Sequence, residues 1–373
     1  MKKQLLIVHS SNDLYGASKI MLQIIDLLRQ SYDISIVLPY SGPLDDLIKK
    51  KGASLEIMNL GVFRKKYFNF FGLINRFLKI IKAVFRINYL IKKKKIDTVY
   101  TSTSLILAGA IAAKLNRIPS FFHIHEIPNN KFYSVIMGFF ISLFSDKIIV
   151  VSKSVQDHWT NFISKGNFQL IYNGIDFPAI KKSISKSKKI KILTIARILP
   201  YKGHIYLIEI AKKLLKNHKN IEFIIIGDAF KGYESYEKKL KSLVVQYALE
   251  DKIIFKGFKS NINKYLSESN FLLHPAIQPD PLPTVIFEAV YAKLPVIATN
   301  LGGAVEVLDN GNGGLLIPYN DSDCASRLIS EYIFDFEKYN IQKEYAFSYA
   351  SKNFSSKKFD KNIRETFGIK NFI

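Results

Sequence analysis

The segment PDPLPTVIFEA combines two carboxylates with a loop that proline stiffens. Asp280 and Glu288 lie on either side of Pro283, and an apolar run follows at once. In a purely structural interpretation, Pro283 is the first residue of a helix that Thr284 and Val285 continue. In a functional interpretation, N–H groups of a rigid loop leading into a helix bind an anion, and the two acids hold hydroxyl groups beside it. Both interpretations stay open on this segment alone.

Two cations stand in the segment ARILPYKG, after a predicted strand and before a helical pattern. Arg197 offers a planar fork of donors and Lys202 a point charge, and the two together suit a diphosphate. Two solvated cations near each other are also ordinary in a chain with 54 Lys and Arg residues. The diphosphate interpretation therefore depends on the other motifs.

The segment FFHIHE contains two histidines and an acid near the end of a predicted strand. Alternate residues of an extended segment share a face, so His123 and His125 have a spacing that could bind a metal. The sequence has no further His or Cys cluster with ligand spacing, and we expect no metal. With Glu126, the histidines could hydrogen-bond a polar substrate, one of them acting in proton transfer. A hydrogen-bonded core histidine is the structural alternative.

Single glycines follow several predicted strands, where a backbone can approach a ligand closely. Gly16 stands between the first strand and a helix, and Gly227 ends a later strand. Phe258 follows another strand end, where its ring could meet a nucleobase. A simple strand-to-helix turn explains Gly16 equally well. The first loop lacks the fingerprint GxGxxG, which disfavours a nicotinamide dehydrogenase.

Short apolar runs alternate with helical patterns along the chain, which favours βα units and parallel sheets. In the first half we expect strands at residues 5–9, 34–38, 54–58, 97–101, 120–124, 147–151 and 168–172. In the second half we expect strands at residues 191–196, 222–227, 252–257, 271–275, 295–299 and 314–318. Two doubly wound halves place ligands in a cleft, at the carboxyl ends of the strands.

A linker is predicted at residues 177–189, FPAIKKSISKSKK, which are short of large apolar side chains and rich in Lys and Ser. It separates an expected N-terminal domain, residues 1–176, from a C-terminal domain, residues 190–353. A C-terminal helix at about residues 354–373 could pack back on the first domain. A chain of 373 residues is long enough for two such cores.

The composition is globular, with 48% hydrophobic and 23% charged residues. The single cysteine, Cys324, excludes an internal disulfide framework and fits a reducing compartment. The apolar run near the N-terminus is too short for a signal peptide, and no stretch approaches the roughly 20 apolar residues of a membrane span. Residues 132–144, FYSVIMGFFISLF, are expected to form a buried or interfacial helix. These features indicate a cytoplasmic protein.

The net charge of +23 favours an anionic partner: nucleic acid, a membrane surface or small anions. Compositional bias toward Lys and Ile explains the charge as well. Residues 63–95 alternate Phe and Ile with cations at helical spacing, which predicts an in-plane contact with an anionic membrane. An ordinary core helix with a solvated face is the alternative. No nucleic-acid-binding motif is present, so we expect no nucleic-acid partner.

Taken in order, these motifs resemble the retaining glycosyltransferases of family four, which have the GT-B fold of two Rossmann-like, doubly wound α/β domains facing each other across a cleft. The resemblance rests on the glycine at 16, HIHE at 123–126, NGID at 173–176, ARILPYKG at 196–203, IIGD at 225–228, PDPLPTVIFEA at 280–290 and GGAVE at 302–306. Each motif is degenerate, but the ordered set spans nearly the whole chain.

The resemblance implies a role for each carboxylate and cation. Asp280 would contact hydroxyls of the transferred sugar and Glu288 the ribose of the donor nucleotide. Backbone N–H groups near Pro283, Thr284 and Val285 would face the diphosphate, which Arg197 and Lys202 would neutralise. His125 aligns best with the family histidine near the acceptor, with His123 second. Asp280 departs from the commoner Glu by one methylene.

We therefore predict a glycosyltransferase that moves a hexosyl group from a UDP- or GDP-linked sugar to a lipid-linked or polysaccharide acceptor, with retention and without a cofactor. Its predicted catalytic residues are His125 and Asp280. Its predicted substrate-binding residues are Gly16, His123, Glu126, Arg197, Lys202, Gly227, Phe258, Pro283, Thr284, Val285 and Glu288. We expect it on the inner face of the cell membrane. The alternatives are a sugar-nucleotide epimerase on the same fold and a non-catalytic basic nucleic-acid or scaffold protein.

Overall fold

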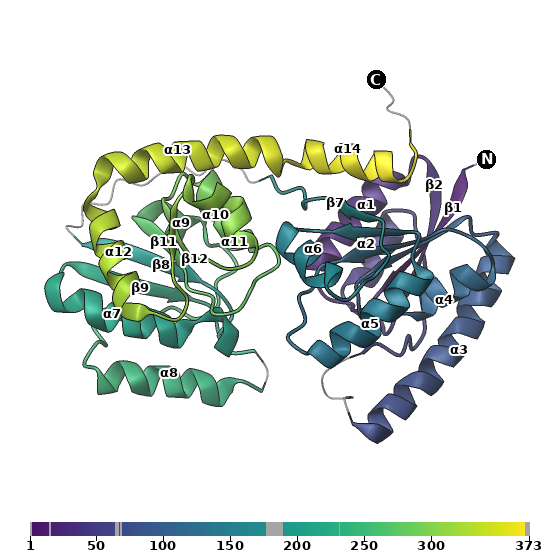
Figure 1. Ribbon diagram of the computed structural model, residues 1–373, viewed down its shortest axis with the longest axis horizontal. Helices are drawn as coiled ribbons and strands as arrows, with labels where there is room; N and C mark the ends of the chain where they lie inside the picture. The colour runs from purple at the N-terminus through teal and green to yellow at the C-terminus, as the bar shows by residue number, and fades with distance from the viewer. Residues whose placement is uncertain are drawn as a thin grey trace. The chain divides into compact units, whose positions relative to one another are not determined.

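The structure is a computed structural model that describes residues 2–14, 16–63, 67, 69–176, 189–230 and 232–369. The chain divides into two compact units (Figure 1). Unit 1 comprises Met1–Gly174 and Ser356–Ile373, and unit 2 comprises Ile175–Ser355. Most of the expected linker, residues 177–188, lies outside the described residues.

Unit 1 contains a seven-stranded parallel sheet in the order β3-β2-β1-β4-β5-β6-β7. The strand order reverses between β1 and β4, which flank each other with Leu5 opposite Thr98. Such a reversal is a topological switch point, where open α/β sheets bind ligands. The strands are β1 Lys3–His9, β2 Tyr32–Leu38, β3 Ser54–Ile57, β4 Thr98–Ser102, β5 Ser120–Ile124, β6 Lys147–Val150 and β7 Phe168–Leu170.

Helices cover both faces of this sheet because successive strand residues point to opposite faces. Leu5 and Ile7 pack under α1, α2 and α14, whereas Leu6 and Val8 pack under α3 and α4. Phe122 and Ile148 pack under α5 and α6. The helices are α1 Gly16–Leu28, α2 Leu44–Lys50, α3 Phe70–Lys94, α4 Ala108–Leu115, α5 Lys131–Phe144, α6 Lys153–Thr160 and α14 Ser356–Thr366.

The last described helix, α14, belongs to unit 1 and packs against α1 (Figure 1). Phe359, Ile363 and Phe367 enter the core beneath α1. Lys147 donates to the backbone carbonyl of Thr366 at 2.8 Å, which ties the helix end to β6. The chain segment that follows unit 2 therefore completes the first unit.

Unit 2 contains a six-stranded parallel sheet in the order β10-β9-β8-β11-β12-β13. Its switch point lies between β8 and β11. The strands are β8 Ile190–Ile195, β9 Ile221–Ile226, β10 Ile253–Phe255, β11 Phe271–His274, β12 Val296–Thr299 and β13 Leu315–Ile317. The helices are α7 His204–Asn217, α8 Glu234–Gln246, α9 Asn263–Glu268, α10 Thr284–Tyr291, α11 Gly303–Val307, α12 Ser322–Phe334 and α13 Phe336–Asn353.

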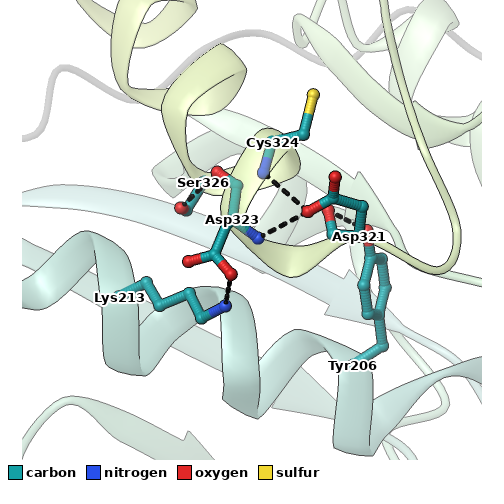
Figure 2. Close-up of polar contacts among 6 residues, drawn as sticks. All are labelled: Tyr206, Lys213, Asp321, Asp323, Cys324 and Ser326. Carbon is teal, nitrogen blue, oxygen red and sulfur yellow. Dashed lines mark hydrogen bonds and ion pairs between the residues drawn. The ribbon is translucent and has the colours of Figure 1, made fainter.

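A polar cluster joins α12 to α7 in unit 2 (Figure 2). Asp321 caps α12 by accepting hydrogen bonds from the backbone N–H groups of Asp323 at 3.1 Å and Cys324 at 2.9 Å. Lys213 of α7 forms an ion pair with Asp323 at 2.5 Å, and Tyr206 donates to the Asp321 carbonyl at 3.0 Å. The cluster therefore fixes the first turn of α12 against α7.

The expected strands are all present, with ends that differ by a residue or two. The prediction of two doubly wound, Rossmann-like α/β domains is therefore confirmed. Residues 132–144 form most of α5, which buries one face and exposes the other. Among the described residues, no helix is both long enough and apolar enough to span a bilayer.

Candidate active site

A cluster of polar side chains lies at the carboxyl ends of β1, β4 and β5 in unit 1. His9, the last residue of β1, is fully buried, and its Nε2 lies 3.0 Å from Ser18 Oγ on α1. Ser18 Oγ in turn donates to Asp13 at 3.1 Å. This cluster is at the switch point of the sheet, which is the expected ligand position for the fold.

The two histidines of β5 lie against each other in this cluster. Their ring centroids are 4.1 Å apart, with planes inclined by 38°. His123 is fully buried, and its Nδ1 contacts the Tyr100 hydroxyl at 2.5 Å. Nε2 of His123 and Nε2 of His125 are both buried and have no hydrogen-bond partner in the described part of the chain. Buried polar atoms of this kind are normally satisfied, so they mark a place for a polar ligand or water.

Burial keeps these imidazoles neutral because it disfavours their charged form. It lowers the pKa of His9 to about 4 and the pKa of His125 to about 3. Burial, and secondarily His125, holds the pKa of His123 well below its ordinary value. The cluster therefore offers neutral rings, which can each donate and accept a hydrogen bond at neutral pH.

The carboxylate of Glu126 is hydrogen-bonded within the protein. Its carboxylate accepts hydrogen bonds from Thr103 Oγ1 at 2.6 Å and from the backbone and hydroxyl of Ser104, each at 3.1 Å. Its backbone carbonyl accepts the indole N–H of Trp159 at 3.0 Å. Burial raises the pKa of its carboxyl, and these hydrogen bonds oppose that effect. Glu126 thus holds the loop after β4 in place, and its contact with a substrate stays a prediction.

Gly16 begins α1 and has open space beside it. A Cβ atom added there meets no heavy atom within 4 Å. The neighbouring protein backbone therefore does not require a glycine at this position. Open space beside an exposed residue fits both a ligand approach and a simple turn, so a ligand contact at Gly16 stays a prediction.

We expect Gly16→Ala to leave the melting temperature unchanged or slightly higher. Where alanine fits, it raises the free energy of unfolding by about 0.4–1 kcal/mol, chiefly because it lowers the conformational entropy of the unfolded chain. We expect the same change to lower kcat/KM at least about 10-fold, since the methyl group would occupy ligand space. Differential scanning fluorimetry and initial rates check the two halves of the prediction. Unchanged kinetics would support the alternative interpretation, in which Gly16 is a simple turn residue.

In unit 2, an ion pair joins two loops at the switch point of the sheet. Lys202 lies in the 3₁₀ helix Pro200–Lys202 after β8, and its ammonium pairs with the carboxylate of Asp280. Their side chains are only 21% and 17% exposed. His274, the last residue of β11, is buried and lies close enough to influence both charges.

The electrostatics of this group favour a charged acid and a neutral histidine. Burial alone would raise the pKa of Asp280, but the adjacent Lys202 ammonium, its ion-pair and hydrogen-bond partner, is the largest opposing cause, and the pKa lies below its ordinary value. Burial lowers the pKa of His274 to about 4. Nε2 of His274 is buried without a hydrogen-bond partner among the residues described.

Glycines bring the two loops together. Gly203 has a φ of +77°, and a Cβ there would lie 1.7 Å from the carbonyl oxygen of Pro275. Gly302 has a φ of +58°, and its Cβ would lie 2.5 Å from the carbonyl oxygen of Asp280. Gly303 N–H donates to that same oxygen at 2.8 Å. The glycines of GGAVE thus support the proline-rich loop that carries Asp280.

Pro283 is the N-cap of α10 and not its first helical residue, so the structural interpretation of this proline was wrong by one position. Its ψ of 108° is extended, and the helix begins at Thr284. Thr284 is exposed, Val285 is buried and Glu288 is partly buried. The first N–H groups of a helix have no acceptor within the helix, so the turn that begins at Thr284 can receive an anion.

The remaining predicted residues lie around the ends of β8, β9 and β10. Arg197 is partly buried, and its guanidinium lies 5.2 Å from the ring centre of Phe230. A Cβ at Gly227 would lie 1.9 Å from the carbonyl oxygen of Ala196, so the protein's own backbone accounts for this glycine. Phe258 is 67% exposed. A ligand contact at Gly227 stays a prediction.

Sequence reasoning missed His9 and His274 as candidates. Each is the final residue of a buried strand that borders a switch point, and that position was the available signal. In the described part of the chain, no group of three or more His, Cys, Asp or Glu residues is arranged to hold a metal ion.

Solved structures share this fold. The crystal structure of Anabaena Alr3699/HepE in complex with UDP aligns with a TM-score of 0.81 and 23% identity, covering 99% of this chain and 100% of that one. The lipopolysaccharide outer core galactosyltransferase WaaB aligns with a TM-score of 0.77 and 15% identity, over 98% and 99% of the two chains. At these identities the likeness establishes the GT-B fold.

Family models cover both halves of the sequence. Residues 16–177 match the model Glycosyltransferase Family 4, and residues 176–349 match the model Glycosyl transferases group 1. The chain is a glycosyltransferase of the GT-B fold. The expectation of a transferase is thereby confirmed at this level.

Curated relatives of this glycosyltransferase are distant. The glycosyltransferase MJ1069 of Methanocaldococcus jannaschii is 25% identical over 91% of this chain and 90% of its own length. The amylovoran biosynthesis glycosyltransferase AmsK of Erwinia amylovora is 28% identical over 38% of this chain. The chain spans only 36% and 58% of the length of two other curated relatives, and 35% of the length of AmsK.

Proposed function

We propose that this glycosyltransferase transfers a hexosyl group from a UDP-linked or GDP-linked sugar to a hydroxyl of a lipid-linked or polysaccharide acceptor, with retention of configuration. In this proposal unit 2 binds the donor and unit 1 binds the acceptor. The enzyme would work in surface-glycan biosynthesis, on the cytoplasmic face of the membrane. The observation that carries the proposal is the group of Lys202, Asp280 and His274 at the switch point of unit 2.

The donor chemistry uses the charges of this group. Breaking the bond between the anomeric carbon and the phosphate oxygen leaves negative charge on the diphosphate, which Lys202 and Arg197 would neutralise. The first turn of α10 would add backbone N–H groups. Asp280, ionised and held by Lys202, is suited to accept hydrogen bonds from sugar hydroxyls. Glu288, one turn into α10, would accept a hydrogen bond from the ribose.

The acceptor chemistry uses the neutral histidines of unit 1. His125 would orient the acceptor hydroxyl by a hydrogen bond at Nε2, with His123 behind it. A histidine with a pKa of about 3 is a weak base, so we propose that the departing phosphate oxygen accepts the hydroxyl proton. The new bond then forms between the acceptor oxygen and the anomeric carbon on the face that the phosphate leaves.

Relatives support the substrate classes. Anabaena Alr3699/HepE has been solved with UDP and with UDP-glucose. A Campylobacter jejuni relative, 26% identical over 52% of this chain, is named an N-acetylgalactosamine-N,N'-diacetylbacillosaminyl-diphospho-undecaprenol 4-alpha-N-acetylgalactosaminyltransferase. That name describes a diphospho-lipid acceptor, and AmsK is named for amylovoran biosynthesis. These names favour a nucleotide sugar as donor and a lipid-linked or polysaccharide acceptor.

A panel of UDP- and GDP-linked sugars tests the proposal. We expect one donor to raise the melting temperature and then to support transfer to a lipid-linked acceptor, detected as glycan product. Lys202→Ala should remove the melting shift, while the matched variant Lys213→Ala, which breaks the ion pair shown in Figure 2, should keep it. Epimerised nucleotide sugar as the only product would instead support an epimerase.

We expect activity to survive thorough chelation. The cations proposed to neutralise the leaving diphosphate are Arg197 and Lys202, so a divalent ion is not required for that task. Initial rates before and after exhaustive treatment with EDTA should agree within about twofold. Loss of activity that only Mg²⁺ or Mn²⁺ restores would contradict this assignment of the two cations.

The proposed membrane contact uses α3, which comprises most of residues 63–95; residues 64–66 and 68 lie outside the described chain. One face of α3 is buried, with Ile80, Ile87 and Ile91 in the core. Phe77 and Phe85 of the same helix expose 63% and 69% of their surface. A helix with exposed aromatic rings and lysines suits an in-plane position at an anionic bilayer.

The end of α3 supplies a test of this contact. Lys94 is bound to Ser54 at 2.8 Å, so the exposed cations are Lys92, Lys93 and Lys95. Replacing these three by Gln should weaken binding to vesicles containing anionic lipid by roughly 100-fold, at about 1 kcal/mol for each cation. Vesicle co-sedimentation at low salt measures the change.

A charge-matched control separates this contact from net charge. Replacing Lys238, Lys239 and Lys259, which are exposed in unit 2, by Gln removes the same charge and should leave vesicle binding unchanged. Equally weakened vesicle binding in both triple variants would show that overall charge, and not the end of α3, causes the effect. Absence of any vesicle binding by the unaltered protein would remove the membrane contact from the proposal.

A further inference from the structure

Helix α5 exposes a purely apolar stripe that the proposed membrane contact of α3 does not use. Phe132, Val135, Phe139 and Leu143 are 59%, 55%, 62% and 49% exposed. They recur at helical spacing, on the side opposite the buried Met137 and Ile141. A contiguous exposed apolar face of this kind marks an interaction site more often than a solvated surface.

An apolar groove lies between α5 and α3. It has a volume of 410 Å³, in the range of small-molecule sites. Helix α4 forms its floor, α3 one wall and α5 the other. The residues that define it include Leu73 and Phe77 of α3, Leu107 and Ile111 at α4, and Ile136 and Phe140 of α5.

A second cavity of 710 Å³ adjoins the groove, since Phe63 and Tyr133 line both spaces. Its lining mixes apolar side chains with polar ones, among them Glu126, Asn130 and Lys131. Tyr133 is fixed there, because its hydroxyl donates to the carbonyl of Ser104 at 3.0 Å. The charged and amide side chains therefore gather in the second cavity, whereas the groove is lined by apolar side chains and Tyr133.

This polarity fits an amphiphile. An apolar chain would lie between α3 and α5, and a phosphorylated head would lie by Lys131, next to Glu126 and the adjoining His125. The exposed rings on both walls would contact the bilayer, so the chain could enter the groove from lipid without crossing water. The basic side chains Lys82 and Arg86 on the outer side of α3 add attraction to an anionic membrane surface.

We propose that the groove between α3 and α5 binds the isoprenoid chain of a lipid-linked phosphorylated acceptor and thereby aligns the acceptor head with the histidine cluster of unit 1. This inference rests on the proposed function, which it deepens by naming the acceptor as an isoprenoid-linked diphosphate. It also assigns chain contacts to the groove-lining residues Phe77, Ile136 and Phe140.

Binding of soluble isoprenoid diphosphates tests the groove directly. Farnesyl diphosphate and isopentenyl diphosphate carry the same head with a long and a short chain. In calorimetric titrations with saturating UDP present to occupy the donor site, we expect farnesyl diphosphate to bind at least about 10-fold more tightly, because only its chain fills the groove. Equal affinity for the two ligands, or for inorganic diphosphate, would overturn the proposal.

Variants locate the chain. Phe77→Asp places a charge on the groove wall at an exposed position, and Ile136→Trp fills the groove with an apolar ring. Each should weaken farnesyl diphosphate binding at least about 10-fold. The matched variants Phe85→Asp and Phe139→Asp change exposed rings of the same two helices that do not line the groove, and they should bind as the unaltered protein does. Similar losses in all four variants would overturn the groove assignment.

Four further outcomes separate this proposal from others. Donor-induced melting shifts should be unchanged in Phe77→Asp, because the donor residues lie in unit 2. Transfer to an isoprenoid-linked acceptor with unaltered kcat/KM in Phe77→Asp would overturn the groove while leaving the proposed function intact. Chain-dependent binding without any stabilisation by a nucleotide sugar would support the groove and contradict the function. A dimer that Phe77→Asp dissociates, with ligand affinity unchanged, would make the groove an interface between copies and overturn the proposal.

Discussion

Lys202→Ala is expected to lower kcat/KM by roughly 30-fold or more, because truncating one partner of a buried charge pair costs about 2–5 kcal/mol. Two effects act together. The diphosphate loses a cation, and Asp280 loses the partner that keeps its carboxylate ionised in a largely buried position. Initial rates at subsaturating donor measure the loss.

Arg197→Ala should lower kcat/KM as well, because the departing diphosphate loses the second cation that is proposed to neutralise it. A double-mutant cycle of Lys202→Ala and Asp280→Ala should show strong coupling, since their side chains are in direct contact. Lys213→Ala is the matched control, for its ion pair with Asp323 lies on the α7–α12 contact. Near-normal kinetics in both Arg197→Ala and Lys202→Ala would contradict the diphosphate assignment.

The free energy of unfolding is expected to fall steeply as the pH drops from about 6.5 toward 4. The histidines concerned share a pKa that desolvation lowers, to about 4 for His9, His204 and His274, to about 3 for His125 and well below the ordinary value for His123. In the unfolded chain each binds a proton near pH 6.5, whereas in the folded chain it does so only near its lowered pKa. The stability that the neutral histidines contribute is therefore fully present above pH 6.5 and is lost as the pH falls toward 4.

Each buried histidine contributes up to about 1.4 kcal/mol per pH unit within the window. Glu126 acts in the opposite direction, because burial raises the pKa of its carboxyl, but it is a single group. Urea unfolding at a series of pH values measures the slope. Replacing His9 or His274 by Gln should reduce it by about one histidine's share. A flat free energy of unfolding between pH 7 and 4.5 would contradict the neutral buried histidines.

Where strands and helices lie was largely predictable from residue pattern. Runs such as LLIVH and EFIIIG are buried on both faces, and helical stripes separate them, so the parallel doubly wound arrangement follows from local periodicity. Helix ends were less predictable, as Pro283 shows. Its φ of −71° is compatible with a helix, and only its ψ of 108°, which the packing of its loop fixes, places it outside α10.

Which side chains meet was not predictable in the same way. Lys202 and Asp280 are 78 residues apart, and their contact depends on Gly203 lying against Pro275 and Gly302 lying against Asp280. Those approaches are tertiary, because the contacting backbones belong to different βα units. His274 takes part because β11 ends beside them at the switch point, a neighbour that no sequence spacing reveals.

The sequence by itself determined the two-domain α/β class, the strand positions, and the loops in which the candidate residues of this glycosyltransferase lie. Only the tertiary structure decided that Glu126 is held by Thr103 and Ser104, that His9 joins the histidines of β5, and that an apolar groove opens between α3 and α5. The physical reason is that local periodicity reports which face of an element is buried. Local periodicity carries no information about which other element covers that face. The order of strands in the sheet decides that.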